Sequence, residues 1–170
     1  KNIDANGWSK DIEFRLQENK EFLLKDIYNT TERIDIVVCN PPFHGSQEEA
    51  AKSTQRKTDN LGTTKGLNFG GTANELWYPG GEKAFIAKLM DESKTHADKT
   101  LWFTTLVSRK EHLQFLKKKL KSINPEMTKT IFMGQGNKTS QILCWSFHDK
   151  KTHFTWCSPW KIKKDESTSL

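Results

Sequence analysis

The feature that most limits how this chain can fold is the run IDIVVC at residues 34–39. It is compact, apolar and β-branched, and it ends at Asn40-Pro41-Pro42, where the prolines lack the N–H groups that a central strand needs. Such a run is typical of a buried parallel strand that opens into a loop at its carboxyl end. In open α/β sheets, ligands bind at that end of the strands.

The segments after residue 80 alternate between helical and strand patterns. Apolar residues at helical spacing predict a helix over 82–93, and a second helix places Leu113, Leu116 and Leu120 on one face. Further strands are predicted at 101–107, 128–133 and 140–147, the last two joined by a hairpin turn at 134–137. This order predicts an α/β fold with a mostly parallel sheet that ends in an antiparallel hairpin strand.

Other segments carry weaker patterns. Alternation over 12–16 predicts a half-buried strand, and 18–28 reads as a short helix. Nearly forty residues separate the prolines from the helix at Glu82, and their apolar side chains favour an ordered lid or substrate loop over a disordered linker. We expect a partial domain over 1–147 and a polar, irregular extension over 148–170.

Net charge, hydropathy and the spacing of cysteines and histidines limit what kind of protein this is. The net charge of +6 and the pI near 9.2 favour a polyanionic partner. No window is apolar enough for a membrane span and no signal peptide opens the chain, so we expect a cytoplasmic protein. The three cysteines and five histidines lack the spacing of a disulfide framework or a metal site, and we expect the cysteines to be buried thiols.

The tetrapeptide Asn40-Pro41-Pro42-Phe43 suits the chemistry of a weakly nucleophilic amine. The exocyclic amine of adenine reacts poorly because its lone pair is delocalised into the ring. The amide oxygen of Asn40 and the carbonyl of Pro41, accepting the amine's N–H bonds, would localise that pair on nitrogen. Proline holds the carbonyl in place, and Phe43 offers a face for the base to stack on. The competing interpretation, that the prolines only end a strand and Phe43 is core, is disfavoured by the position directly after a buried strand.

The tetrapeptide resembles motif IV of the S-adenosylmethionine-dependent amino-methyltransferases. The surrounding sequence is similar to the bacterial large-subunit ribosomal RNA adenine-N6 methyltransferase family called RlmF, whose members are relatives of the eukaryotic METTL16. The similarity covers most of residues 12–147 and is carried by NPPFHGS at 40–46, NFGGTANELWYPGGEKAFI at 68–86, WFTTLVSR at 102–109 and ILCWSF at 142–147.

This resemblance implies a Rossmann-like class I methyltransferase fold, S-adenosylmethionine as cofactor, and N6-methylation of one adenosine in 23S ribosomal RNA. It assigns catalysis to the tetrapeptide Asn40–Phe43. Asn40 would also lie beside the methyl donor, and Gln17 and Asn19 fall where the cofactor's adenine would be bordered. His44 is not needed as a base, because methyl transfer from a sulfonium requires no proton to be removed beforehand.

One part of the class I pattern is missing from this sequence. Such a fold begins with a strand, a Gly-rich turn for the cofactor and a second strand that ends in an acid, and none of these precedes Ile12. The turn at 134–137 is no substitute, because it joins two strands and opens no helix. The sequence therefore predicts the C-terminal, substrate-reading half of a larger enzyme, and it leaves open whether this half holds the cofactor alone.

Basic residues near the tetrapeptide are expected to surround the mouth of the crevice and contact RNA phosphates, with a solvated charged face as the alternative. These residues are Lys52, Arg56, Lys57, Lys65, Arg109 and Lys110. Trp156 and Trp160, which lie near several lysines, fit either an aromatic contact to RNA or packing of the extension on the sheet.

Three functions remain open from the sequence. The basic charge and the extended resemblance favour methylation of ribosomal RNA. The same tetrapeptide also serves the methylation of adenine in DNA and of glutamine side chains in proteins. The third function is that of a non-catalytic RNA-binding fragment, because the Gly-rich cofactor loop is absent. No oligomeric state is indicated.

Overall fold

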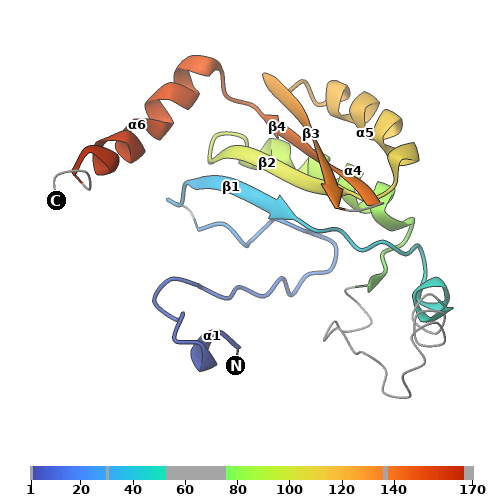
Figure 1. Ribbon diagram of the computed structural model, residues 1–170. Coiled ribbons are helices and arrows are strands. Elements are labelled where there is room, and N and C mark those ends of the chain that lie inside the picture. The colour runs from blue at the N-terminus through green and yellow to red at the C-terminus, as the bar shows by residue number, and fades with distance from the viewer. Residues whose placement is uncertain (1, 30, 53–75, 136–137, 167–170) are drawn as a thin grey trace.

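The computed structural model describes residues 2–29, 31–52, 76–135 and 138–166, and it centres on a four-stranded sheet in the order β1-β2-β4-β3 (Figure 1). The strands are β1 (Ile34–Cys39), β2 (Thr100–Val107), β3 (Met127–Gln135) and β4 (Lys138–Ser146). β1 and β2 pair in parallel, and β4 is antiparallel to β2 and to β3. Three strands therefore run in one direction and β4 runs against them, which confirms the predicted sheet.

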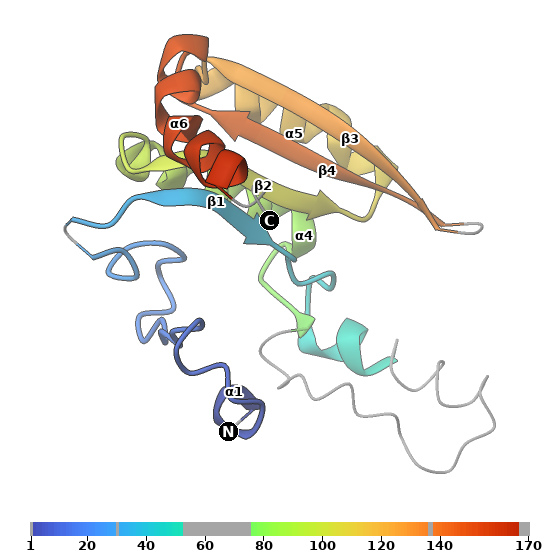
Figure 2. The ribbon, with the colours of Figure 1, turned by 60° about the vertical axis from the view of Figure 1, so that its left-hand side comes forward.

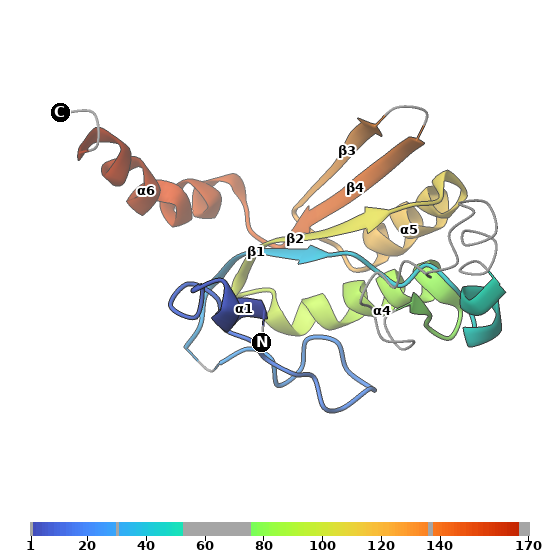
Figure 3. The ribbon, with the colours of Figure 1, turned by 60° about the horizontal axis from the view of Figure 1, so that its bottom comes forward.

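Two long helices cover one face of this sheet. α4 (Gly81–Ser93) continues into the short η1 (Lys94–His96) and leads to β2, and α5 (Lys110–Ser122) joins β2 to β3. Figure 3 shows α4 below β1 and β2 and α5 beside the end of β2. The N-terminal α1 (Asn2–Ala5) is a single turn.

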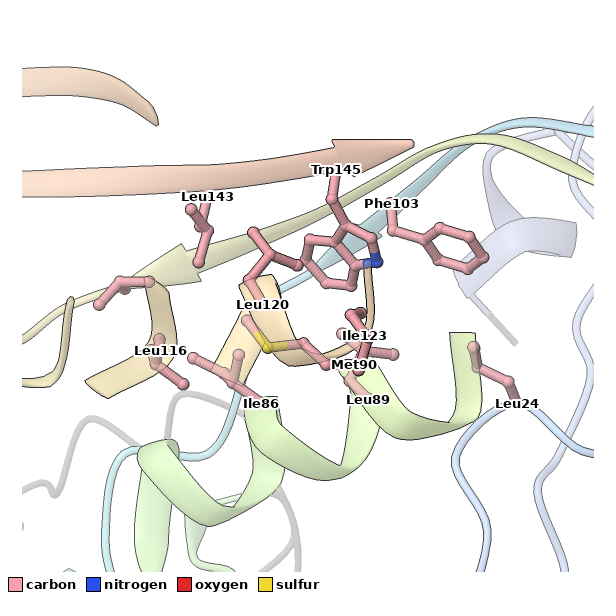
Figure 4. Close-up of a cluster of buried hydrophobic side chains, with 11 residues drawn as sticks. Leu24, Ile86, Leu89, Met90, Phe103, Leu116, Leu120, Ile123, Leu143 and Trp145 are labelled. Carbon is pink, nitrogen blue, oxygen red and sulfur yellow. The ribbon is translucent and has the colours of Figure 1, made fainter. Parts of the chain in front are cut away.

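The hydrophobic core lies between the sheet and these two helices (Figure 4). Phe103 and Trp145, from neighbouring strands, stack with ring centroids 5.7 Å apart, and both are 0% exposed. The helices contribute Ile86, Leu89, Met90, Leu116 and Leu120. Full burial of one such side chain stabilises a fold by about 1.5–3 kcal/mol. This layer therefore supplies the main stabilisation of the described residues.

The strand predicted over 12–16 is wrong. This segment has no regular secondary structure, and the apolar side chains of Ile12, Phe14 and Leu16 are 44%, 76% and 68% exposed. A strand needs a neighbour for its backbone N–H and C=O groups, and no strand within the described ranges pairs with this segment.

The helix predicted over 18–28 is also wrong, because turns occupy this segment. Asp26 has a positive φ of 66°, which a helix does not allow. The carboxylate of Glu92 in α4 accepts the N–H groups of Leu23 and Leu24 at 2.8 Å each, so these donors are satisfied without a helical turn. A tertiary contact has replaced the local structure that the residue pattern indicated.

The extension after β4 is a helix, α6 (Lys150–Glu166), and the predicted irregular structure is wrong. The Oδ1 atom of Asp149 accepts the N–H of Thr152 at 2.7 Å, as a helix N-cap does. Trp156 is 8% exposed and donates its indole N–H to Asp35 Oδ1 at 2.7 Å, and the guanidinium of Arg33 lies 3.8 Å from its ring centroid. Trp156 thus packs against the sheet, while the side chain of Trp160 lies outside what the structure describes.

The predicted lid and the three cysteines can be compared with the described residues. The predicted lid falls mostly on residues 53–75, outside the described residues. Cys144 is a buried free thiol as predicted, whereas Cys39 and Cys157 are free but only half-buried. Burial raises the pKa of the Cys39 and Cys144 thiols. In the described part of the chain, no helix is long and apolar enough to cross a membrane, and no group of three possible ligands could hold a metal ion.

Candidate functional site

The predicted tetrapeptide and the loop after β2 leave the sheet at the same edge. Cys39 pairs with Thr105 in the parallel β1–β2 ladder, so Asn40 and Ser108 begin neighbouring loops at the carboxyl ends of the two strands. Asn40 is exposed, Pro41 is buried and Pro42 is half-buried. Phe43 is 37% exposed, so its ring is open to a stacking partner. The interpretation of Phe43 as a core residue is therefore wrong.

A backbone bridge holds the chain directly after the tetrapeptide. His44 donates its N–H to the carbonyl of Leu76 at 3.2 Å, and Tyr78 donates its N–H to the carbonyl of His44 at 3.0 Å. The bridge joins the loop after β1 to the segment that leads into α4 (Figure 2). The tetrapeptide is thus fixed on both sides, by β1 before it and by this bridge after it.

Two glycines at the start of α4 allow this close approach. Gly80 and Gly81 have φ values of 81° and 66°, which side chains with a Cβ rarely adopt. A Cβ atom on Gly80 would lie 2.7 Å from the Cβ of Ala84. Gly81 packs against Gly45, whose Cα would be 3.6 Å from an added Cβ. The Gly-Gly pair therefore has a backbone role beside the tetrapeptide.

The carboxylate of Glu49 links the loops that follow β1 and β2. Its Oε2 accepts the N–H of Gly45 at 2.8 Å, and its Oε1 lies 3.5 Å from Nη2 of Arg109 and 3.8 Å from Nδ1 of His44. The Gly45 N–H, with His44 and Arg109 nearby, holds the pKa of Glu49 below its ordinary value. The carboxylate therefore stays charged and keeps Arg109 close to the tetrapeptide.

A second carboxylate, Glu82, lies behind this loop. Its Oε1 accepts the N–H of Ser108 at 2.6 Å, and its Oε2 lies 2.7 Å from Nδ1 of His112. Sequence reasoning missed both Glu49 and Glu82. An acid in the first turn of a helix normally faces solvent and complements the helix dipole, so no local signal marks Glu82 as buried.

The predicted RNA-binding residues divide into two groups. Lys52, Arg109 and Lys110 are exposed, and they lie on the segments that follow the tetrapeptide and β2. Arg109 is close to Glu49 and also lies 3.9 Å from Glu111. Arg56, Lys57 and Lys65 lie outside the described residues. The role of all six in RNA binding stays a prediction.

The contacts of the predicted cofactor residues Gln17 and Asn19 are local. The side chain of Gln17 donates to the carbonyl of Lys25 at 2.6 Å and accepts the N–H of Asn19 at 3.0 Å. Among the described residues, no contact with the tetrapeptide decides their role, so cofactor binding by Gln17 and Asn19 stays a prediction.

Known proteins resemble this chain in sequence and in fold. Residues 1–149 match a family described as RNA methyltransferase. The chain is 42% identical over 160 residues to the ribosomal RNA large subunit methyltransferase F of Pseudomonas putida strain GB-1, covering 91% of this chain and 51% of that protein. It is 44% identical over 157 residues to the protein of that name from Pectobacterium atrosepticum, covering 91% and 50%. The chain thus spans about half the length of these curated relatives.

A solved structure supports the same grouping. The human METTL16 catalytic domain, in complex with the MAT2A 3'UTR hairpin 1, matches with a TM-score of 0.70 and 26% identity over 88% of this chain and 50% of that one. This likeness confirms the predicted methyltransferase fold class. Since the matched residues 1–149 include the whole described sheet and the tetrapeptide at its carboxyl edge, the chain belongs to the RNA methyltransferase family.

Proposed function

We propose that a full-length protein that contains this chain, called the intact protein below, methylates N6 of an adenosine in large-subunit ribosomal RNA. The reaction would take place in the cytoplasm, with S-adenosylmethionine as donor. The observation that carries this proposal is the exposed Asn40 beside the buried Pro41 at the carboxyl end of β1. Residues 1–147 would supply the part of the domain that binds the acceptor, followed by the extension 148–170. The relatives named for large-subunit methylation and the net charge of +6 support RNA as the acceptor.

Asn40 and Pro41 would activate the acceptor amine. The side-chain oxygen of Asn40 and the carbonyl oxygen of Pro41 each accept one N–H of the adenine amine, which draws its lone pair out of the ring. The interaction is stronger in the transition state, where the nitrogen gains positive charge, than in the ground state. Burial of Pro41 holds its carbonyl in place, so little entropy is lost on binding.

Phe43 would hold the extruded base. Its ring is 37% exposed and lies three residues from Asn40, at the same edge of the sheet. Stacking on an aromatic side chain contributes about 1–3 kcal/mol per base, comparable with the few kcal/mol that extrusion of a base costs. An unpaired adenosine is therefore the easier substrate.

The described residues fit the acceptor side of such a site. S-adenosylmethionine supplies a methyl group on a sulfonium. We propose that the residues of this chain that border the cofactor are Asn40, Gln17 and Asn19. Within the described ranges β1 has a neighbour on one edge only, which leaves the other edge able to pair with a further strand. We therefore propose that the cofactor cradle comes from a preceding half of the protein, as the length of the relatives supports.

The test incubates unmodified large-subunit ribosomal RNA with labelled S-adenosylmethionine and analyses the nucleosides by mass spectrometry. We expect N6-methyladenosine from the intact protein and none from its Asn40→Ala variant, whose RNA affinity stays near that of the parent. Near wild-type turnover by Asn40→Ala would overturn the assignment of this residue.

Assays of the 170-residue chain and of other acceptors separate the alternative functions. If the chain alone binds RNA without forming product while the intact protein forms it, the chain is the substrate-reading half. If methylation is found on DNA adenine or on protein glutamine but not on RNA, the proposed RNA substrate is wrong and that acceptor takes its place. RNA binding by the intact protein without methylation of any acceptor would favour a non-catalytic binding protein.

A further inference from the structure

Glu82 is a buried carboxylate that the proposed chemistry does not use. Its side chain is 0% exposed, although it stands in the first turn of α4. Burial of a charged carboxylate is costly unless strong donors satisfy its oxygens. Here each oxygen has one short contact, Oε1 with the N–H of Ser108 at 2.6 Å and Oε2 with Nδ1 of His112 at 2.7 Å.

These two partners lie on either side of Arg109. Ser108 precedes it in the loop after β2, and His112 follows it in the first turn of α5. His112 also donates its backbone N–H to the carbonyl of Arg109 at 3.0 Å. The residues on both sides of Arg109 are therefore held by one carboxylate, because Glu82 contacts the N–H of Ser108 and the ring of His112.

The anchor of this arrangement also contacts the loop after the tetrapeptide. Gly81, directly before Glu82, packs against Gly45 and the carbonyl carbon of His44. Glu82 is therefore placed relative to the tetrapeptide on one side and to Arg109 on the other. Its carboxylate sets the spacing between the loops that follow β1 and β2.

We propose that Glu82, together with His112, is a positioning residue that holds Arg109 at the crevice to contact a phosphate of the RNA substrate. This inference rests on the function proposed above.

The surroundings of the Arg109 side chain suit such a contact. Its side chain is 48% exposed, and its nitrogens lie 3.5 Å from Glu49 and 3.9 Å from Glu111, two carboxylates that are themselves 48% and 72% exposed. Ion pairs of this kind contribute little in solvent. A phosphate, which a guanidinium binds through two parallel hydrogen bonds, is a stronger partner and can replace them.

Glu92 provides a matched control on the same helix. Its side chain is 15% exposed and its Oε2 accepts the N–H groups of Leu23 and Leu24 at 2.8 Å each. It thus ties backbone amides to α4 as Glu82 does, but near the other end of the helix. A loss of stability alone would affect both sites, whereas a loss of RNA contact would affect only Glu82.

The test measures the affinity of the intact protein for unmodified large-subunit ribosomal RNA at a series of KCl concentrations. Glu82→Met removes the acceptor at similar volume, Glu82→Gln keeps one acceptor oxygen, and Glu92→Met is the control. Arg109→Ala and the double variant Glu82→Met/Arg109→Ala complete a cycle. Thermal unfolding of each variant reports its stability separately.

We expect Glu82→Met and Arg109→Ala each to weaken RNA binding about tenfold, as loss of a hydrogen bond to a charged group does. Each should lower the slope of log affinity against log salt by about 0.7 to 0.9, the contribution of one phosphate contact. The double variant should match Arg109→Ala within a factor of about two, since both changes remove the same contact. Glu82→Gln should recover part of the affinity, and Glu92→Met should lower only the melting temperature.

Three results would overturn the proposal: equal effects of Glu82→Met and Glu92→Met on RNA affinity, additive effects in the double variant, or no effect of Arg109→Ala. If Glu82→Met does not fold, His112→Leu, which removes one partner of the carboxylate, takes its place in the cycle. Because all readouts are binding constants, they remain valid if the wild-type protein binds RNA without methylating it. That outcome would contradict the proposed function and leave the positioning role to be judged by the cycle.

Discussion

The two faces of the sheet differ in how this chain covers them. On the face toward α4 and α5, Phe103, Trp145 and Leu143 are at most 1% exposed and form the core (Figure 4). Alternation along the strands directs Ile36, Val38, Ile131 and Met133 to the other face. These side chains are 52%, 78%, 48% and 40% exposed, respectively.

Within the described residues, the apolar side chains of the strands are therefore buried on one face of the sheet and exposed on the other. Parallel strands are normally covered on both faces, and the run at 34–39 has the composition of such a strand. α6 contacts the sheet through His153 and Trp156, and Figure 3 shows the helix extending beyond the strands rather than covering this face. We infer that this face is covered in the intact protein by residues outside this chain, because the relatives are about twice as long as the chain. The following predictions test the comparison.

The largest effect is expected on the covered face. Trp145 is 0% exposed, stacks on Phe103 and donates its indole N–H to Ser93 Oγ at 3.0 Å. Trp145→Ala should lower the free energy of unfolding of the 170-residue chain by about 3–5 kcal/mol. Ile131→Ala, on the second face, should change it by less than about 1 kcal/mol. Urea denaturation measures both, and equal losses would contradict the described difference between the faces.

An intermediate effect should depend on which form of the protein is studied. Val38→Lys places a charge at a side chain that is 78% exposed, so it should change the stability of the 170-residue chain by less than about 0.5 kcal/mol. In the intact protein the same change should cost about 2 kcal/mol or more, because the charge would be buried. Val37→Lys, which faces the core, should destabilise both forms. The inferred cover is wrong if denaturation midpoints show that Val38→Lys is tolerated equally in both.

The smallest effect concerns α6, which meets the second face at one end. His153 lies with its ring centroid 4.9 Å from that of Trp102, and its Nε2 is 2.9 Å from the Ser146 hydroxyl. Burial, helped by the nearby charges of His148 and Lys129, lowers the pKa of His153 below its ordinary value, although Asp149 opposes this. The neutral form is therefore favoured in the fold, and its contribution is complete above the unfolded-state pKa of about 6.5.

Stability should accordingly fall as the pH drops below that value and through the lower folded-state pKa. Denaturation of the 170-residue chain at about pH 7.5 and about pH 5.5, the range in which histidine titrates, measures the change. His153→Asn, which keeps a polar partner for Ser146 but does not titrate there, should reduce the pH dependence. An unchanged dependence in this variant would assign the effect to other groups, such as His96, whose pKa is also lowered by burial.

Much of the fold was predictable because its signals are local. The β-branched run at 34–39 and the helical spacing of Leu116 and Leu120 are local patterns, and the structure has β1 and α5 there. The predicted burial of the strand at 34–39 is wrong within the described residues, where none of its side chains is buried. The tetrapeptide was located for the same reason, since two prolines cannot donate the N–H groups of a strand and so mark the start of a loop. The wrong predictions, at 12–16, 18–28 and 148–170, fall where contacts with other segments decide which secondary structure forms.

The sequence by itself determined the order of strands and helices from β1 to β4, the position of the tetrapeptide and the family, because hydrophobic periodicity, proline geometry and motif spacing are properties of the chain alone. Only the tertiary structure decided that Glu82 is buried, that Glu49 lies near Arg109, and that Trp156 packs on Asp35. Each of these contacts joins residues far apart in sequence, and burial of a charge or an indole depends on what packs around it rather than on its neighbours in the chain.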